Sequence, residues 1–171
     1  IGTFGILLAI SGTIGAWLGG RLDDKLGPKT VVAGSLVILL GAIASILLIS
    51  RDTIFFIPVT PPVPDGGLFA APAEKAYLAL GFLIGLAAGP MQAASRTMLI
   101  RLAPQDRITQ CFGLFALTGK VTSFLGPLLI GLVTAAANSQ KAGMAVLVLF
   151  FASGLILLTR VTAEAVRARP V

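Results

Sequence analysis

The chain has 171 residues, of which 56% are hydrophobic and 12% are charged, and its mean hydropathy is +0.98. Average soluble domains carry roughly a quarter charged residues, so this chain lacks the polar groups that cover a soluble domain. This composition excludes a soluble fold and predicts an all-α protein in the lipid bilayer. With no histidine and one cysteine, Cys111, the chain offers neither an internal disulfide nor a histidine-bound metal site, and we expect no cofactor.

Charged residues occur in clusters, and the apolar stretches between them can cross about 30 Å of hydrocarbon at about 1.5 Å per residue. They predict about five membrane-spanning helices, at residues 3–20, 30–50, 73–102, 109–137 and 142–158. Residues 51–72 are predicted to form a proline-rich loop, because proline removes backbone donors. Residues 159–171 form a short basic tail. Because the chain starts without Met inside an apolar run, we expect it to be a fragment.

The basic residues are distributed unequally between the two ends of these predicted helices. Eight lie on one side, namely Arg21, Lys25, Lys29, Arg101, Arg107, Arg160, Arg167 and Arg169, and three on the other, namely Arg51, Lys75 and Lys141. Cytoplasmic loops carry an excess of Lys and Arg, which predicts a cytoplasmic C-terminus and an extracytoplasmic proline-rich loop. The charges form no continuous patch, so we expect no nucleic-acid partner.

Small residues recur at spacings of three and four in two of the predicted spans. The first stripe comprises Gly5, Ala9, Gly12, Ala16 and Gly19, and the second comprises Gly81, Gly85 and Ala88. Minimal side chains let two membrane helices approach closely and gain dispersion contacts. The stripes therefore predict close helix packing.

Lys120 lies nine residues beyond Cys111, roughly 14 Å into the fourth span, which is too deep for its stem to reach the interface easily. It shares a small, polar helix face with Gly113, Ala116, Ser123 and Pro127. Two interpretations remain open. Lys120 either faces a water-filled path, with Ser123 beside it, and attracts an anionic group, or it pairs with helix carbonyls or a carboxylate from outside this segment.

Two further polar residues lie inside the third span. Gln92 follows Pro90, about ten residues from the predicted inner end, and proline kinks a helix and frees a carbonyl. Gln92 either binds a substrate or hydrogen-bonds to a neighbouring helix. Arg96 is about six residues from that end, where an arginine either snorkels to phosphate or pairs with a loop acid.

The segment between the first two spans contains Gly20, Leu22, Asp24, Lys25, Gly27 and Lys29. Its glycines permit a tight turn. Asp24 can cap a helix or pair with an arginine at a neighbouring helix end, the candidates being Arg96 and Arg101. Such a conformational latch would hold one conformation and release in another. The alternative is a solvated turn whose charges set the topology.

These six residues resemble the signature of the major facilitator superfamily, Gly-x-Leu-x-Asp-Arg/Lys-x-Gly-x-Lys/Arg. Pro28 departs from it, because a basic residue usually stands at that position. Residues 92–96, 101–104 and 112–127 resemble more specifically the vacuolar amino-acid effluxer-like branch. The resemblance implies that residues 1–171 are the second to sixth helices of a C-terminal half, which works with a missing N-terminal half.

The resemblance also implies a function: secondary active transport of small organic solutes, amino acids among them, by alternating access. Lys120 favours a small-molecule substrate with an anionic group. We expect that the protein is not an enzyme, because its sequence shows no nucleophile–base pair, acid pair or metal site. The alternatives are a non-transporting sensor or accessory subunit with the same fold and, less favoured, a membrane-embedded enzyme. We expect a multi-pass protein of a bacterial plasma membrane.

Overall fold

The computed structural model describes residues 2–50, 53–54, 57–58 and 71–162. Its helices are α1 (Gly2–Leu26), α2 (Pro28–Leu48), α3 (Pro72–Leu102), α4 (Ile108–Ala137) and α5 (Gln140–Thr159), with a short 3-10 helix, η1 (Gln105–Arg107), between α3 and α4. Each of the five long helices is long and apolar enough to cross a membrane. The prediction of an all-α membrane protein is confirmed.

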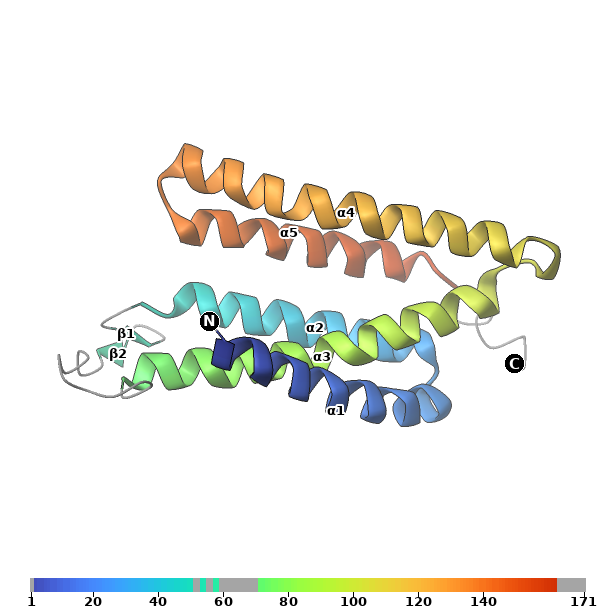
Figure 1. Ribbon diagram of the computed structural model, residues 1–171, viewed down its shortest axis with the longest axis horizontal. Helices are drawn as coiled ribbons and strands as arrows, with labels where there is room; N and C mark the ends of the chain where they lie inside the picture. The colour runs from blue at the N-terminus through green and yellow to red at the C-terminus, as the bar shows by residue number, and fades with distance from the viewer. Residues whose placement is uncertain (1, 51–52, 55–56, 59–70, 163–171) are drawn as a thin grey trace.

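The helices run alternately up and down the bundle, so the connections gather at its two ends (Figure 1). One end, which we call the basic end, holds the α1–α2 turn, η1 and the residues that follow α5. It carries Arg21, Lys25, Lys29, Arg101, Arg107 and Arg160, whereas Lys75 and Lys141 lie toward the opposite end. Arg51, Arg167 and Arg169 lie outside the described residues. Which end faces the cytoplasm stays a prediction.

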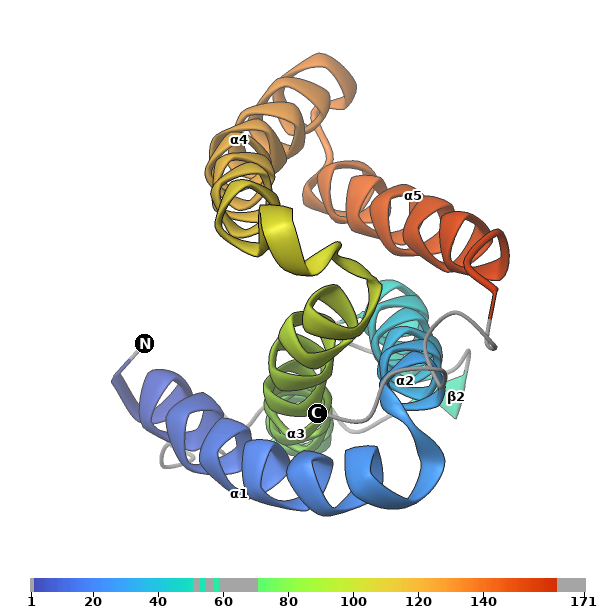
Figure 2. The ribbon, with the colours of Figure 1, turned by 90° about the vertical axis from the view of Figure 1, so that its right-hand side faces the viewer.

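The core forms where α2, α3 and α5 meet. Val31, Val32 and Leu36 of α2 are buried together with Ala94 of α3 and Leu158 of α5. Figure 2 shows α3 between α1 on one side and α4 and α5 on the other. None of the α4 residues, all of which the structure describes, is buried, because α4 packs mainly along α5.

The contact between α1 and α3 is a close backbone contact made by glycines. A Cβ added at Gly15 would stand 2.8 Å from the carbonyl carbon of Leu86, and one added at Gly19 would stand 2.6 Å from the Cα of Pro90. From the other side, a Cβ at Gly89 would stand 2.7 Å from the backbone nitrogen of Ala16. These distances are shorter than real Cβ contacts, so only glycine fits.

The stripe predicted on the first span coincides with the contact face only in part: Gly12 and Gly19 belong to both, and the contact face also includes Ser11 and Gly15. Ser11, Gly15 and Gly19 are buried, whereas Ala9 and Ala16 are exposed, and a Cβ at Gly5 would meet open space. A pattern of small residues shows that a helix can pack closely. Which of two adjacent rows makes the contact depends on the partner helix.

The segment 20–29, for which the sequence predicts a loop, is helical except at Gly27. Helix α1 continues to Leu26 and α2 begins at Pro28. Gly27 has φ +82°, a left-handed conformation that L side chains rarely adopt. Pro28 is fully buried and occupies the first turn of α2, where its missing N–H costs nothing.

A short antiparallel hairpin, β1 (Thr53–Ile54) and β2 (Ile57–Pro58), follows α2. The Tyr77 hydroxyl of α3 donates to the Ile49 carbonyl at 3.5 Å, and Lys141 Nζ of α5 donates to Ser50 Oγ at 2.8 Å. These two hydrogen bonds tie the end of α2 to both neighbouring helices. Most of the predicted proline-rich loop, residues 59–70, lies outside the described residues.

We expect Gly15→Ala to lower the free energy of unfolding by about 1–3 kcal/mol, because the new methyl group overlaps the α3 backbone. Gly20→Ala is the matched control, since Gly20 lies on the same helix with open space around it. The control should be neutral or stabilise by about 0.5–1 kcal/mol through helix propensity. Thermal unfolding in detergent measures both. Equal unfolding temperatures for the two variants would contradict the close contact.

Candidate functional site

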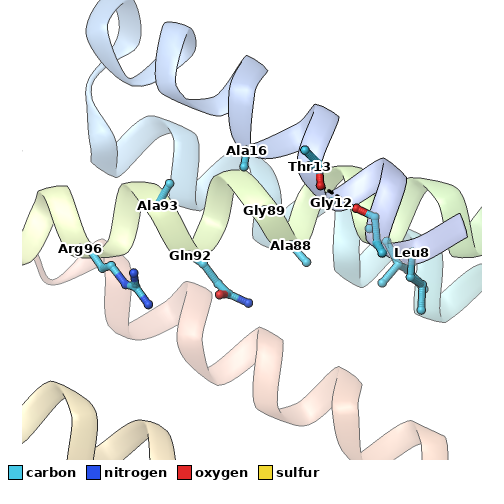
Figure 3. A pocket seen from close by; sticks show the side chains of 12 residues that line it. Leu8, Gly12, Thr13, Ala16, Ala88, Gly89, Gln92, Ala93 and Arg96 are labelled. Carbon is cyan, nitrogen blue, oxygen red and sulfur yellow. Dashed lines mark hydrogen bonds between the residues drawn. The ribbon is translucent and has the colours of Figure 1, made fainter. Parts of the chain in front are cut away.

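A groove of about 760 Å³ runs along the line where α1 and α3 touch. We call it the α1–α3 groove. It is lined by Leu8, Ala9, Gly12, Thr13 and Ala16 of α1 and by Ile84, Gly85, Ala88, Gly89, Gln92, Ala93 and Arg96 of α3. Gly12 and Gly89 line it where the two helices approach, and Gln92 and Arg96 extend from α3 (Figure 3). Most of the lining is apolar or consists of backbone.

Three side chains give this groove its polar character, and two of them project from one face of α3. Gln92 and Arg96 are one helical turn apart, are both exposed, and point to the same side of α3 in Figure 3. The Thr13 hydroxyl donates to the Ala9 carbonyl at 2.9 Å, which leaves its oxygen able to accept. The groove therefore offers a cation, an amide and a hydroxyl oxygen.

Gln92 and Arg96 have no hydrogen-bond or ion-pair partner within residues 2–50, 53–54, 57–58 and 71–162. They lie roughly 15 Å and 9 Å from the end of α3 at Leu102. A guanidinium at this depth is costly in hydrocarbon unless it meets water, a ligand or an opposite charge. Chemically, the pair can bind a carboxylate: Arg96 supplies charge and two parallel donors, and Gln92 supplies an orienting amide.

The structure places Lys120 and Ser123 on α4, outside the lining of the α1–α3 groove. Lys120 is exposed near the middle of that helix. The Ser123 hydroxyl donates to the carbonyl oxygen of Lys120 at 2.7 Å, so it is engaged by its own helix. The roles of both residues in the substrate path stay predictions.

The residues of the predicted latch lie at the basic end. Asp24 is exposed, whereas Asp23 is 8% exposed and its Oδ1 has no hydrogen-bond partner among the described residues. Arg101 is half-buried with an Nε that likewise has no partner there. In the part of the chain that the structure describes, no ion pair joins Asp24 to Arg96 or Arg101. The latch therefore stays a prediction about another conformation.

Sequence reasoning identifies Gln92 and Arg96 separately but misses Thr13 and the fact that one groove joins all three. The signal for Thr13 is weak, because a threonine in a membrane helix usually bonds its own backbone, as this one does. Its position beside Gly12, within the predicted stripe of small residues, is the available clue. The described residues contain no cluster of His, Cys, Asp or Glu that could hold a metal ion.

We expect a cysteine at position 92 to react with water-soluble thiol reagents, because Arg96 and Thr13 give the open groove polar side chains that can hold water. The control is a cysteine at Leu149, a position on α5 that is 71% exposed and surrounded by apolar residues, where lipid excludes charged reagents. Both substitutions are made in a background without Cys111 or any other cysteine. Equal protection of the two positions would show that water does not enter the groove.

The chain is similar to several curated proteins from fungi and bacteria. It is 28% identical over 166 residues to "Autophagy-related protein 22" of Cryptococcus neoformans, a match that covers 94% of this chain and 27% of that protein. It is 37% identical over 76 residues to the protein of the same name in Kluyveromyces lactis, covering 44% of this chain and 15% of the relative.

A bacterial relative is an uncharacterized MFS-type transporter of Bacillus subtilis, which is 29% identical over 85 residues, or 50% of this chain and 20% of that protein. The chain thus spans about a quarter of the length of the first fungal relative. No solved structure matches the chain. The model of the family described as vacuole effluxer Atg22-like matches residues 2–169. The chain therefore belongs to the Atg22-like vacuole effluxer family, an MFS-like branch of membrane proteins.

Proposed function

We propose that this chain forms part of a secondary active transporter that moves small organic solutes, amino acids among them, by alternating access. The observation that carries the proposal is the unpaired Arg96 beside Gln92, both among described residues, in a groove at membrane depth. An arginine this close to a helix end can snorkel to a lipid phosphate, but the place of Arg96 beside Gln92 in one groove favours a solute path. Membership of an effluxer family supports the same conclusion.

The charge of the groove favours a substrate with a negative group. Arg96 lines the groove, Lys120 lies exposed on α4, and the apolar parts of the five spans contain no carboxylate. An anionic group would be attracted to both cations, while a purely cationic solute would be repelled. An α-carboxylate meets this requirement and fits the bidentate geometry of a guanidinium.

The chain supplies only one side of such a path. It spans 27% of the length of its Cryptococcus relative, and α4 has no buried residue, so a large helix surface is left for other parts of the protein. We propose that an N-terminal half covers this surface and completes the path. We further propose that the basic end faces the cytoplasm, following the positive-inside bias. The membrane in which the protein resides, bacterial plasma membrane or another, stays a prediction.

A non-transporting sensor or accessory subunit is the second candidate, because the same groove could bind a solute without moving it. A membrane-embedded enzyme is less favoured, since the groove offers no nucleophile with an adjacent base. Uptake of radiolabelled amino acids into proteoliposomes of the full-length protein separates these classes. Binding without uptake would favour the sensor and contradict transport.

We expect Lys120→Gln to weaken the affinity for an anionic substrate about tenfold or more, the loss typical of a hydrogen bond to a charged group. Lys120→Arg should retain part of the affinity, because it keeps the charge but changes its geometry. Lys141→Gln is the control, since Lys141 bonds Ser50 far from this position. The measurement is the concentration dependence of uptake. An unchanged affinity in Lys120→Gln would remove this residue from the path.

The proposed latch predicts that Asp24→Asn changes transport far more than Asp23→Asn. Asp24 occupies the signature position and is exposed, so it is available to a partner in another conformation. Asp23 is buried already, and its substitution replaces a carboxylate by a neutral amide of similar size. Transport rates of both variants, with surface expression as the control, test this. Equal and mild effects would make the segment a simple turn.

A further inference from the structure

A second groove lies on the other side of α1, where α1 and α2 diverge and α3 closes the space between them. We call it the α1–α2 groove; its volume is about 330 Å³. Its walls include Leu22 and Leu26 of α1 and Val31 and Ile38 of α2, and Leu86 and Pro90 of α3 form its floor. It arises because α1 and α2 each pack more extensively on α3 than on one another.

The two grooves differ in chemistry. The α1–α3 groove contains Arg96 and Gln92, whereas the polar side chains of the α1–α2 groove are only Thr30 and Ser35, and Ser35 is buried. Leu18, Leu22, Leu26 and Ile38 each keep 39–49% of their surface exposed there. Water would find too few hydrogen-bond partners in this groove, so a hydrocarbon chain suits the groove better than water does.

Three basic side chains lie near this groove at the basic end of the bundle, and one of them has no partner among the described residues. Arg21 is stacked 3.5 Å from the ring centre of Trp17, and Lys29 Nζ donates to the Val161 carbonyl at 2.5 Å. Lys25 is exposed and has no hydrogen-bond or ion-pair partner within the described ranges. It lies three residues beyond Leu22 and seven beyond Leu18, so it continues the helix face that lines the groove.

We propose that the α1–α2 groove binds one acyl chain of an anionic glycerophospholipid, with the lipid phosphate at Lys25. The apolar walls accept the chain, and the ammonium group of Lys25 meets the phosphate where the groove reaches the end of the bundle. Leu22 and Lys25 also belong to the proposed latch segment, so the test below measures lipid labelling and not transport, and its failure would leave the proposed transport function standing.

The chain offers a matched pair of variants for a test. Gly34 lines the groove, and a Cβ added there meets nothing within 4 Å, so Gly34→Leu places an apolar side chain at the groove from a position where its first carbon has room. Gly41 lies two turns further along the same face of α2, also in open space but beyond the groove lining. Gly41→Leu therefore controls for the loss of a glycine and for added apolar surface.

The experiment uses the full-length protein in phosphatidylcholine nanodiscs doped with a phosphatidylglycerol that carries a diazirine in one acyl chain. We expect photolabelling of residues 18–26 and 30–38, mapped by mass spectrometry of peptides. Gly34→Leu should reduce this labelling about threefold or more, because the chain loses its contacts, while Gly41→Leu should not. Lys25→Gln should lower the preference for phosphatidylglycerol over phosphatidylcholine about fivefold, the ratio expected for one basic side chain.

Four outcomes would overturn the proposal. The first is labelling elsewhere, as would occur if another segment or a second copy covered the groove. The second is equal labelling of the Gly34→Leu and Gly41→Leu variants. The third is equal competition by phosphatidylcholine and phosphatidylglycerol, which would remove the role of the headgroup charge. Soluble glycerol phosphate should not compete; if it does, the site binds free phosphate and not a lipid. If Gly34→Leu fails to fold, the effect of Lys25→Gln on the preference for phosphatidylglycerol over phosphatidylcholine tests the proposal alone.

Discussion

The close contact between α1 and α3 is the interaction on which the arrangement of the site depends. Inside a membrane, lipid tails are as apolar as side chains, so helices associate through dispersion contacts at short range and not through a hydrophobic driving force. Gly15, Gly19 and Gly89 bring the two backbones together. Because α1 lies so close to α3, each flank of the contact becomes a groove, one with a cation and an amide in its lining and one without a charged side chain.

Composition and periodicity are sufficient to predict the membrane class and the helical fold, because long apolar stretches separated by clustered charges are typical of membrane-spanning helices. They are less informative where neighbouring elements decide the outcome. The helical segment through Arg21 and Lys25 resembles a loop in the sequence, since charged residues usually mark the ends of spans. The contact face of α1 shares Gly12 and Gly19 with the predicted stripe but also includes Ser11 and Gly15, because the position of α3 determines which small residues make the contact.

The candidate site, too, can be predicted from the sequence only in part. Gln92 and Arg96 can be identified from the sequence, because polar residues in a span are rare and costly. The groove that they share cannot be predicted from the sequence, because it depends on how α1 crosses α3. For Lys120, depth and helix face can be derived from spacing. What the lysine faces depends on surfaces opposite α4, and α4 has no buried residue in this chain.

The hydrogen bond from Lys29 to the carbonyl of Val161 joins two points that are 132 residues apart in the chain. It fastens the first turn of α2 to the segment that follows α5. A shift of α5 along α2 by one helical turn, about 5.4 Å, would break this bond. At the opposite end, the hydrogen bond from Lys141 to Ser50 makes a second tie between α5 and the end of α2, so sliding of α5 along α2 has to break a bond at each end of the bundle.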